Sequence, residues 1–558
     1  MKNWKRLLAL GLSIVMSITV LTSCGKSGQD SGESLSVCVG EAPLTFDPIY
    51  AERLSDQTVL AHMYENLMRV STNSEGATVV TEGAAKNVSV EENADGTVTY
   101  TFRLQDGKWS DGVPVKANDF VYAWQRIVNP SYASPFASML SIISGYDEAR
   151  ATGDMSKLAV TAKSANTLVV TLDGNYDWFL REVCTSPVTV PLRQDVLKKL
   201  YEASKDLDPD GTLDLHWWTN ATKAVTNGPF VVMEQDGDTS LTLTANPHYH
   251  QKRSGPEKIV FRFGDEKTAE KLYETGEVDA IAPLSESWMA SLLETDENWV
   301  PDPELVTHTV MFNCERLTDE HVRKALSLAI DRNAIAEIAG VTAKAAEGLV
   351  PPGVPEGDND FRTKGGTLID HDPETYADRC TEAISLLESS GYESGASLGE
   401  IEYFYVAEGH NGAVAAALCE NWNRVLKTRI TPKAVTREEL LTALKSGDYV
   451  LAEMDVSAVC NDAECFLMDF TIGNSKNYLH YGNSAYDTLM SIIAIAEDGS
   501  ARMGCLHDAE DLLLNIDCAL APLHTCGTAW TLRESYSGAI RDTRGWFSFA
   551  NVYKRPAV

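Results

Sequence analysis

The chain has 558 residues, 44% of them hydrophobic, and a mean hydropathy of −0.18, a composition typical of a globular protein with about two or three domains. Its 80 acidic and 47 basic residues give a formal net charge of −33 at pH 7. A surface this negative repels nucleic-acid phosphates and anionic lipid headgroups, so the composition excludes nucleic acid as a partner.

The first 23 residues have the pattern of a secretory signal. Lys2, Lys5 and Arg6 precede a nearly uncharged apolar run over residues 7–21, and small residues follow it. The Leu-Thr-Ser-Cys ending resembles the lipobox of bacterial lipoproteins, which implies cleavage before Cys24 and attachment of lipid to its sulfur. The alternatives are an ordinary secretory signal or an N-terminal anchor helix. The lipobox predicts a protein on the outer face of the bacterial cytoplasmic membrane.

Residues 24–34 are predicted to form a lipidated, flexible tether, because they are rich in Gly and Ser and show no apolar periodicity. A first strand is expected at 35–39. The clearest strand pattern lies at 97–104, where apolar residues alternate with Thr and Arg. A helix capped by Asn118 or Asp119 should follow and end before Asn129.

Further elements alternate between strand and helix along the chain. We expect a hairpin over 230–245, a strand at 259–263, a helix ended by Gly276 in the left-handed conformation, and a strand at 278–281. Apolar spacing predicts helices over 319–338, 413–426 and 501–514. This interleaving predicts an α/β fold with mixed sheets.

The sequence contains no known catalytic or cofactor-binding motif. There is no nucleophile elbow, zinc-protease motif, phosphate-binding loop or dinucleotide fingerprint, so we expect neither an enzyme nor a cofactor nor a metal site. Ten cysteines follow Cys24. The closest pair, Cys460 and Cys465, matches no zinc or redox spacing, and mostly reduced, buried thiols are predicted.

A much more specific pattern begins at residue 106. Residues 106–120, DGKWSDGVPVKANDF, resemble the signature of the extracellular solute-binding proteins of bacterial ABC importers, family 5. Their continuation over 121–137 is similar to the oligopeptide-binding lipoproteins in particular. Other blocks of this family follow in order, at residues 46–48, 227–230, 246–249, 276–279, 322–332, 386–392 and 486–487.

This resemblance covers residues 35 to 553 and implies the type II periplasmic-binding-protein fold: two lobes joined by a hinge, with an extra domain inserted in the first. The implied division is a signal peptide at 1–23, a tether at 24–34, a first lobe at 35–70, 187–284 and 529–558, an inserted domain at 71–186, and a second lobe at 285–528.

The resemblance also implies which residues contact a ligand. Oligopeptide receptors hold an extended peptide through its backbone, as an added strand. The residues at the corresponding positions of this chain are Glu52, Leu54, Phe136, His410, Arg437, Glu453, Asp455, Val456, Ser457, Val459 and Asp462.

Several positions depart from the oligopeptide-binding pattern. The aspartate that pairs with the peptide α-ammonium is Val459 in this chain, a basic position is Glu453, and a tryptophan position is Arg437. An ammonium buried without a partner is costly. The hypothesis is therefore that Glu453, Asp455 or Asp462 supplies the anion, or that the ligand is held in another register.

The implied function is a monomeric peptide receptor that delivers its ligand to ABC permease subunits with cytoplasmic ATPases. One alternative is the same fold with another cargo, such as a modified peptide or a cationic solute. The other is a lipoprotein that senses peptides without feeding transport.

Overall fold

The computed structural model describes residues 34–73, 78–204, 216–296, 298–496 and 499–556. The predicted signal peptide (1–23), the lipidation site Cys24 and the tether up to residue 33 lie outside the described residues.

The first lobe is built on a six-stranded sheet of order β20-β11-β1-β10-β9-β8. Strand β1 pairs in parallel with both β10 and β11, whereas the β8–β9 hairpin is antiparallel. The strands are β1 (Ser34–Cys38), β8 (Phe230–Asp236), β9 (Ser240–Ala245), β10 (Lys258–Arg262), β11 (Ala280–Ile281) and β20 (Thr531–Leu532).

The inserted domain contains a four-stranded antiparallel sheet of order β4-β5-β7-β6. Its strands are β4 (Ala85–Glu92), β5 (Val98–Leu104), β6 (Val160–Ser164) and β7 (Thr167–Leu172), and helix α2 (Ala117–Val128) packs on it. A single apolar cluster joins this domain to the first lobe, because it contains Phe102 and Trp124 as well as Val37 and Phe261.

The second lobe has a six-stranded sheet of order β13-β19-β12-β18-β16-β17. Its strands are β12 (Asp302–Phe312), β13 (Lys344–Ala345), β16 (Glu400–Val406), β17 (Arg429–Val435), β18 (Leu451–Ser457) and β19 (Leu520–Thr528). One face of the sheet packs on α8 (Glu320–Leu328), α9 (Arg332–Ala339) and α12 (Asn411–Val425), and the other on α14 (Ala463–Leu467) and α16 (Gly499–Asp511).

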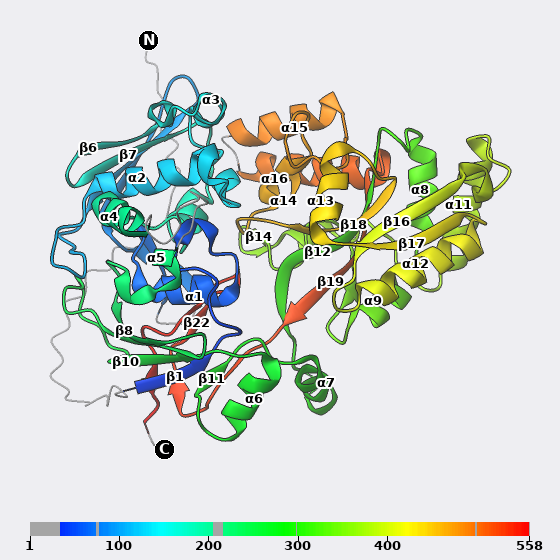
Figure 1. The fold of residues 1–558 in the computed structure, drawn as a ribbon. Helices are drawn as coiled ribbons and strands as arrows, with labels where there is room; N and C mark the ends of the chain where they lie inside the picture. The colour runs from blue at the N-terminus through cyan, green and yellow to red at the C-terminus, as the bar shows by residue number, and fades with distance from the viewer. Residues whose placement is uncertain (1–33, 74–77, 205–215, 297, 497–498, 557–558) are drawn as a thin grey trace, which may run out of the picture.

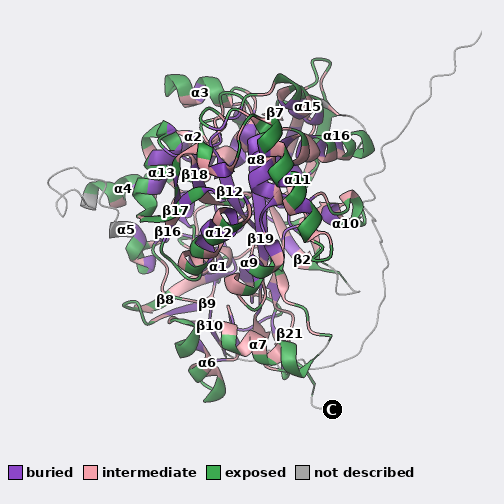
Figure 2. Ribbon diagram, turned by 90° about the vertical axis from the view of Figure 1, so that its right-hand side faces the viewer, coloured by how far each residue is buried: buried purple, intermediate pink, exposed green. Residues whose placement is uncertain are grey.

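Strands β12 and β19 connect the two lobes. They lie side by side between the halves of the molecule in Figure 1 and among buried segments at its centre in Figure 2. Beyond β19 the chain enters the first-lobe sheet as β20. Helix α7 (Glu286–Thr295), which precedes β12, packs through Trp288 and Leu292 against Cys38 and Ile281 of the first lobe.

The remaining elements cover the sheets or form small hairpins. The helices are α1 (Leu54–Met63), α3 (Tyr146–Thr152), α4 (Gln194–Ser204), α5 (His216–Thr219), α6 (Glu266–Glu274), α10 (Phe361–Gly365), α11 (Tyr376–Ser389), α13 (Arg437–Ser446) and α15 (Ser484–Ile495). The hairpins pair β2 (Met68–Thr72) with β3 (Thr78–Glu82), β14 (Pro355–Glu356) with β15 (Asn359–Asp360), β21 (Tyr536–Ser537) with β24 (Tyr553–Lys554), and β22 (Ile540–Arg541) with β23 (Phe547–Ser548).

The structure confirms most of the predicted elements, including the strand at 97–104, the hairpin over 230–245 and Gly276 with a φ of 82°. The single helix predicted over 319–338 is wrong. Helix α8 ends at Leu328, and Asp331 caps the start of a separate helix, α9, because its side chain accepts a hydrogen bond from the backbone N–H of Ala334. No helix within the described residues is long and apolar enough to cross a membrane.

The prediction of mostly reduced cysteines is correct except for one pair. Cys460 and Cys465 form a disulfide, which the sequence spacing did not indicate. The other eight described cysteines are unpaired, and four of them are buried: Cys38, Cys184, Cys419 and Cys518.

A buried ion pair joins the first lobe to the inserted domain. Both Oδ atoms of Asp47 accept hydrogen bonds at 2.6 Å from the guanidinium of Arg126 on α2. The side chains are 0% and 6% exposed. Both residues belong to blocks that carry the family resemblance. These blocks therefore include an ion pair that stabilises the fold.

Arg126→Met should lower the free energy of unfolding by about 3–5 kcal/mol, because it leaves the Asp47 carboxylate buried without a partner. Urea unfolding measures the loss. Lys433→Met is the matched control, because it removes a 2.7 Å ion pair with Glu402 whose side chains are both about half exposed; it should cost less than about 1 kcal/mol. Equal losses in the two variants would contradict a structural role for the buried pair.

Candidate functional site

Three parallel strands of the second lobe end at the same edge of the sheet. Strands β16 and β17 pair in parallel along their whole length, and β18 pairs in parallel with β16. Because β12 and β19 leave the lobe at this edge, it faces the first lobe. In open α/β sheets, ligands bind in the crevice beyond the carboxyl ends of such strands.

Most of the predicted second-lobe residues lie at this edge. His410 precedes α12 after the end of β16, and Arg437 begins α13 after the end of β17. Glu453 and Asp455 lie on β18. The fold thus brings together residues that the sequence places in three separate segments.

Glu453 is a half-buried carboxylate at the centre of this group. Its Oε1 accepts a hydrogen bond from the backbone N–H of Val406 at 2.5 Å and another from Nδ2 of Asn411 at 3.2 Å. The pKa of Glu453 is raised to about 7, mainly by burial; the negative charge of Asp455 acts in the same direction, and these hydrogen bonds act against it.

Asp455 is exposed, but its carboxylate already accepts a hydrogen bond. Its Oδ1 accepts a hydrogen bond from Nδ1 of His308 at 2.6 Å, and the imidazole of His308 stacks on that of His524 with ring centroids 4.3 Å apart. Burial lowers the pKa of His308, but its hydrogen bonds with Asp455 and Cys526 outweigh this effect and raise the pKa to about 10. Burial and the charge of His308 lower the pKa of His524 to about 3.

The remaining residues of the predicted peptide strand lie on β18 or just beyond its end. Val456 is buried in the second-lobe core, so only its backbone is available to a ligand. Ser457 is exposed. Val459 is half-buried and packs against the apolar cluster of the first lobe and the inserted domain.

Asp462 belongs to a buried charge network between the second lobe and the inserted domain. It is 2% exposed, and its Oδ1 accepts a hydrogen bond from Arg502 at 2.7 Å. Arg502 also binds Glu464, which in turn accepts a hydrogen bond from the indole N–H of Trp178. Because its carboxylate is already neutralised and buried, Asp462 is not available to bind a ligand amine.

His410 and Arg437 are exposed and form ion pairs at the rim. His410 lies 3.2 Å from Glu286 of α7, and Arg437 lies 2.7 Å from Glu408. Glu286 also accepts a hydrogen bond from the backbone N–H of Val341. The His410 contact therefore links α12 to a helix that packs on the first lobe.

The predicted first-lobe residues form a second group. Glu52 is exposed in the loop that follows Tyr50, and Leu54 is the first residue of α1. Phe136 is half-buried in a loop that two hydrogen bonds attach to residues 49–50: Tyr50 Oη to the Tyr132 carbonyl and Ser134 Oγ to the Ile49 carbonyl.

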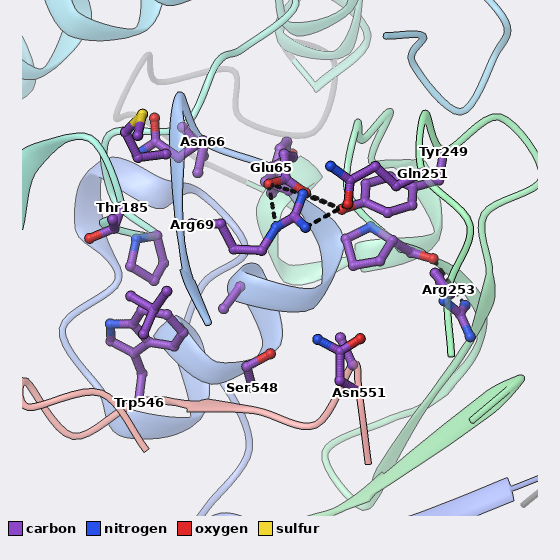
Figure 3. A pocket seen from close by; sticks show the side chains of 18 of the residues that line it. Glu65, Asn66, Arg69, Thr185, Tyr249, Gln251, Arg253, Trp546, Ser548 and Asn551 are labelled. Atoms are coloured by element: carbon purple, nitrogen blue, oxygen red, sulfur yellow. Dashed lines mark hydrogen bonds and ion pairs between the residues drawn. The ribbon is translucent and has the colours of Figure 1, made fainter. Parts of the chain in front are cut away.

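A separate small pocket lies inside the first lobe (Figure 3). Arg69 donates hydrogen bonds to Glu65, Gln251 and Tyr249, and Tyr249 donates another to Glu65. Because these polar groups are hydrogen-bonded to one another, we interpret the pocket as part of the fold and not as a ligand site. Tyr249 belongs to a family block, which here supports the first lobe.

Sequence reasoning missed His308, His524 and Cys526. They lie on β12 and β19, next to Asp455, and the predicted ligand residues gave no indication of them. The His-x-Cys spacing at 524–526 was the available signal, because alternate residues of a strand share one face. His308 carries no local signal, since only the pairing of the strands brings it to His524.

Two lobes joined by a pair of strands, with charged side chains gathered where the lobes face each other, define a two-lobed solute-binding protein. Residues 80–478 match the family of bacterial extracellular solute-binding proteins, family 5. The chain belongs to this family.

Similar curated proteins include the oligopeptide-binding protein OppA of Bacillus subtilis, 27% identical with 99% of each chain covered. The probable deoxycholate-binding periplasmic protein YgiS of Escherichia coli is also 27% identical, with 86% of each covered. Among solved structures, Haemophilus influenzae OppA in complex with the peptide RPPGFSPFR has a TM-score of 0.72 at 25% identity, covering 94% of this chain and 99% of that one. These similarities support the predicted two-lobed fold.

Glu453→Gln should stabilise the protein more at pH 8 than at pH 5. A carboxyl whose pKa is higher in the folded than in the unfolded state binds more protons when folded, so stability falls as pH rises from about 4.5 to 7. Glutamine removes this loss, and the gain at pH 8 over that at pH 5 should be about 1–2 kcal/mol for a half-buried group. Urea unfolding at both pH values measures it.

The matched control is Glu400→Gln, an exposed position at the start of β16. It should change stability equally at both pH values. A Glu453→Gln variant that behaved in the same way would show that burial does not disfavour the ionised carboxylate.

Proposed function

We propose that this protein is a lipid-anchored receptor on the outer face of the bacterial cytoplasmic membrane, that it binds extended oligopeptides between its two lobes, and that it delivers them to an ABC importer. The observation that carries the proposal is the half-buried carboxylate of Glu453 on β18, hydrogen-bonded to the last residue of β16 at the edge that faces the first lobe. Family membership supports the transport role, and the names of several relatives support peptide as the ligand.

Strand β18 and its continuation through residues 457–459 suit an extended ligand. Main-chain hydrogen bonds are the same for every peptide sequence, so a receptor that uses them tolerates many side chains. The predicted contacts on the first-lobe side are Glu52, Leu54 and Phe136. The division into lobes and inserted domain at the boundaries given above is part of this proposal.

Glu453 is the anion best suited to hold a peptide amino terminus. Asp455 already accepts a hydrogen bond from His308, and Asp462 is paired with Arg502. An ammonium beside Glu453 would favour the ionised carboxylate and lower its pKa. Affinity for an amine should therefore rise with pH as Glu453 loses its proton near pH 7.

A second candidate function is the binding of a solute other than a peptide. Two observations favour it: Val459 replaces the aspartate expected for an α-ammonium, and one relative is named as a probable deoxycholate-binding protein. A peptide receptor should retain peptides from a mixed pool, whereas a receptor for another solute should not.

The first test is native mass spectrometry of residues 25–558 with a pool of random tri- to hexapeptides. Retention of peptides with mixed sequences is expected. Glu453→Gln should weaken binding of a retained peptide about tenfold, because a charge-assisted hydrogen bond to its amine is lost.

N-acetylation of the peptide and Glu400→Gln are the two controls. The acetylated peptide should bind wild type and Glu453→Gln equally, and Glu400→Gln should bind the free peptide like wild type. Retention of no peptide from the pool would overturn the peptide assignment and favour the alternative cargo.

The lipid anchor has its own test. Cys24→Ser should abolish incorporation of labelled palmitate and release the protein from the membrane fraction, because the predicted acceptor sulfur is gone. Cys38→Ser, in β1, should leave labelling unchanged. Labelling of the Cys24→Ser variant would contradict the predicted lipobox.

A further inference from the structure

Three directly opposed residues form a row across the strands that connect the lobes. Asp455 on β18 is the register partner of His308 on β12, and His308 is the register partner of His524 on β19. Opposed residues of neighbouring strands project from the same face of a sheet. Cys526, two residues beyond His524, projects from this face as well.

The ligand atoms of His308, His524 and Cys526 all lie within 4.8 Å of one another. Among the residues that the structure describes, this is the one such group of three histidine, cysteine or acidic side chains. Cys526 is an unpaired thiol, and its Sγ lies 3.6 Å from Nδ1 of His524.

We propose that His308, His524 and Cys526 bind one Zn²⁺ ion at the junction of the two lobes. Two imidazole nitrogens and one thiolate suit the borderline-soft Zn²⁺ ion better than the hard ions Mg²⁺ and Ca²⁺, which take oxygen ligands. The site is distinct from the proposed peptide contact at Glu453 and does not depend on the cargo.

The distances agree with tetrahedral coordination. Zn–N bonds of about 2.0 Å and Zn–S bonds of about 2.3 Å place tetrahedral ligand atoms roughly 3.3–3.6 Å apart. The Cys526–His524 separation of 3.6 Å already has this value. The widest separation, at most 4.8 Å, closes with a shift of about 1 Å, which rotation of the half-exposed His308 side chain can supply.

Asp455 orients the site without binding the metal. Histidine ligands of metals usually donate their second ring N–H to a carboxylate, which fixes the ring and makes the coordinating nitrogen more basic. The 2.6 Å hydrogen bond from Nδ1 of His308 to Asp455 is this arrangement and leaves Nε2 for the ion. Three protein ligands leave the fourth tetrahedral position to water.

The site would link two strands that belong to both lobes. His308 lies on β12, and His524 and Cys526 lie on β19. The bound ion would clamp this pair of strands. Zinc should therefore raise the thermal unfolding temperature of the whole protein.

The test is calorimetric titration of Zn²⁺ into the chelator-stripped, reduced protein of residues 25–558. Wild type should bind one equivalent with a Kd below about 1 μM. Cys526→Ser, His524→Ala and His308→Gln should each weaken binding at least tenfold, and Asp455→Asn should weaken it about 10- to 100-fold with the stoichiometry retained.

Cys380→Ser, which removes another half-buried unpaired thiol, is the matched control and should bind like wild type. Co²⁺ provides a second readout, because a thiolate ligand gives a charge-transfer absorption band that Cys526→Ser should lose and Cys380→Ser should keep. Circular dichroism checks that each variant is folded, and Cys526→Ser changes a single atom of the side chain.

Three results would overturn the proposal: no Zn²⁺ bound by wild type, equal affinity in wild type and the folded Cys526→Ser and His308→Gln variants, or a wild-type Co²⁺ complex without the charge-transfer band. Equal affinities would mean that Zn²⁺ binds elsewhere on the acidic surface. The Cys526→Ser variant should still retain peptides from the pool. A failure of the zinc proposal can therefore be distinguished from a failure of the peptide assignment.

Discussion

The antiparallel pairing of β12 with β19 holds the two lobes of this protein together. Each strand runs within the second-lobe sheet and continues toward the first lobe, so their shared register fixes which edge of that sheet faces the first lobe. The carboxyl ends of β16, β17 and β18 meet at this edge, and the same register places His308 opposite His524. The proposed ligand-facing edge and the candidate zinc site therefore depend on one set of backbone hydrogen bonds.

Several residues of the blocks that carry the family resemblance form contacts within the fold, whereas the predicted peptide positions are where this chain departs from the oligopeptide-binding pattern. Asp47 and Arg126 join the first lobe to the inserted domain, and Tyr249 completes a network with Glu65 and Arg69. Burying an ion pair has a large desolvation cost, so loss of either partner is strongly destabilising. That cost restricts substitution at such positions. The exposed positions Asp455 and Ser457, which the resemblance places in the peptide strand, are free of this constraint.

The charges near the proposed site are arranged so that one acid stays available. Asp455 is held by His308 and Asp462 by Arg502, whereas the pKa of Glu453 is raised mainly by burial. A carboxylate that is disfavoured in the empty protein gains most when a cation binds beside it. With Val459 at the position of the family aspartate, the proposed amine-binding group is Glu453 on β18, six residues earlier in the chain.

The sequence alone determined the periodic elements and the family. The strand at 98–104, the hairpin over 230–245 and the family blocks were predictable, because alternation, turn residues and ordered motifs are local properties of the chain. The gathering of His410, Arg437 and Glu453 at one edge followed from the resemblance, but the partners of each did not. The break at Asp331, the Cys460–Cys465 disulfide, the burial of Asp462 and the His308–His524–Cys526 group were decided by the tertiary structure alone. Each depends on distances between strands or helices that only the packed sheets establish, and composition and spacing carry no information about those distances.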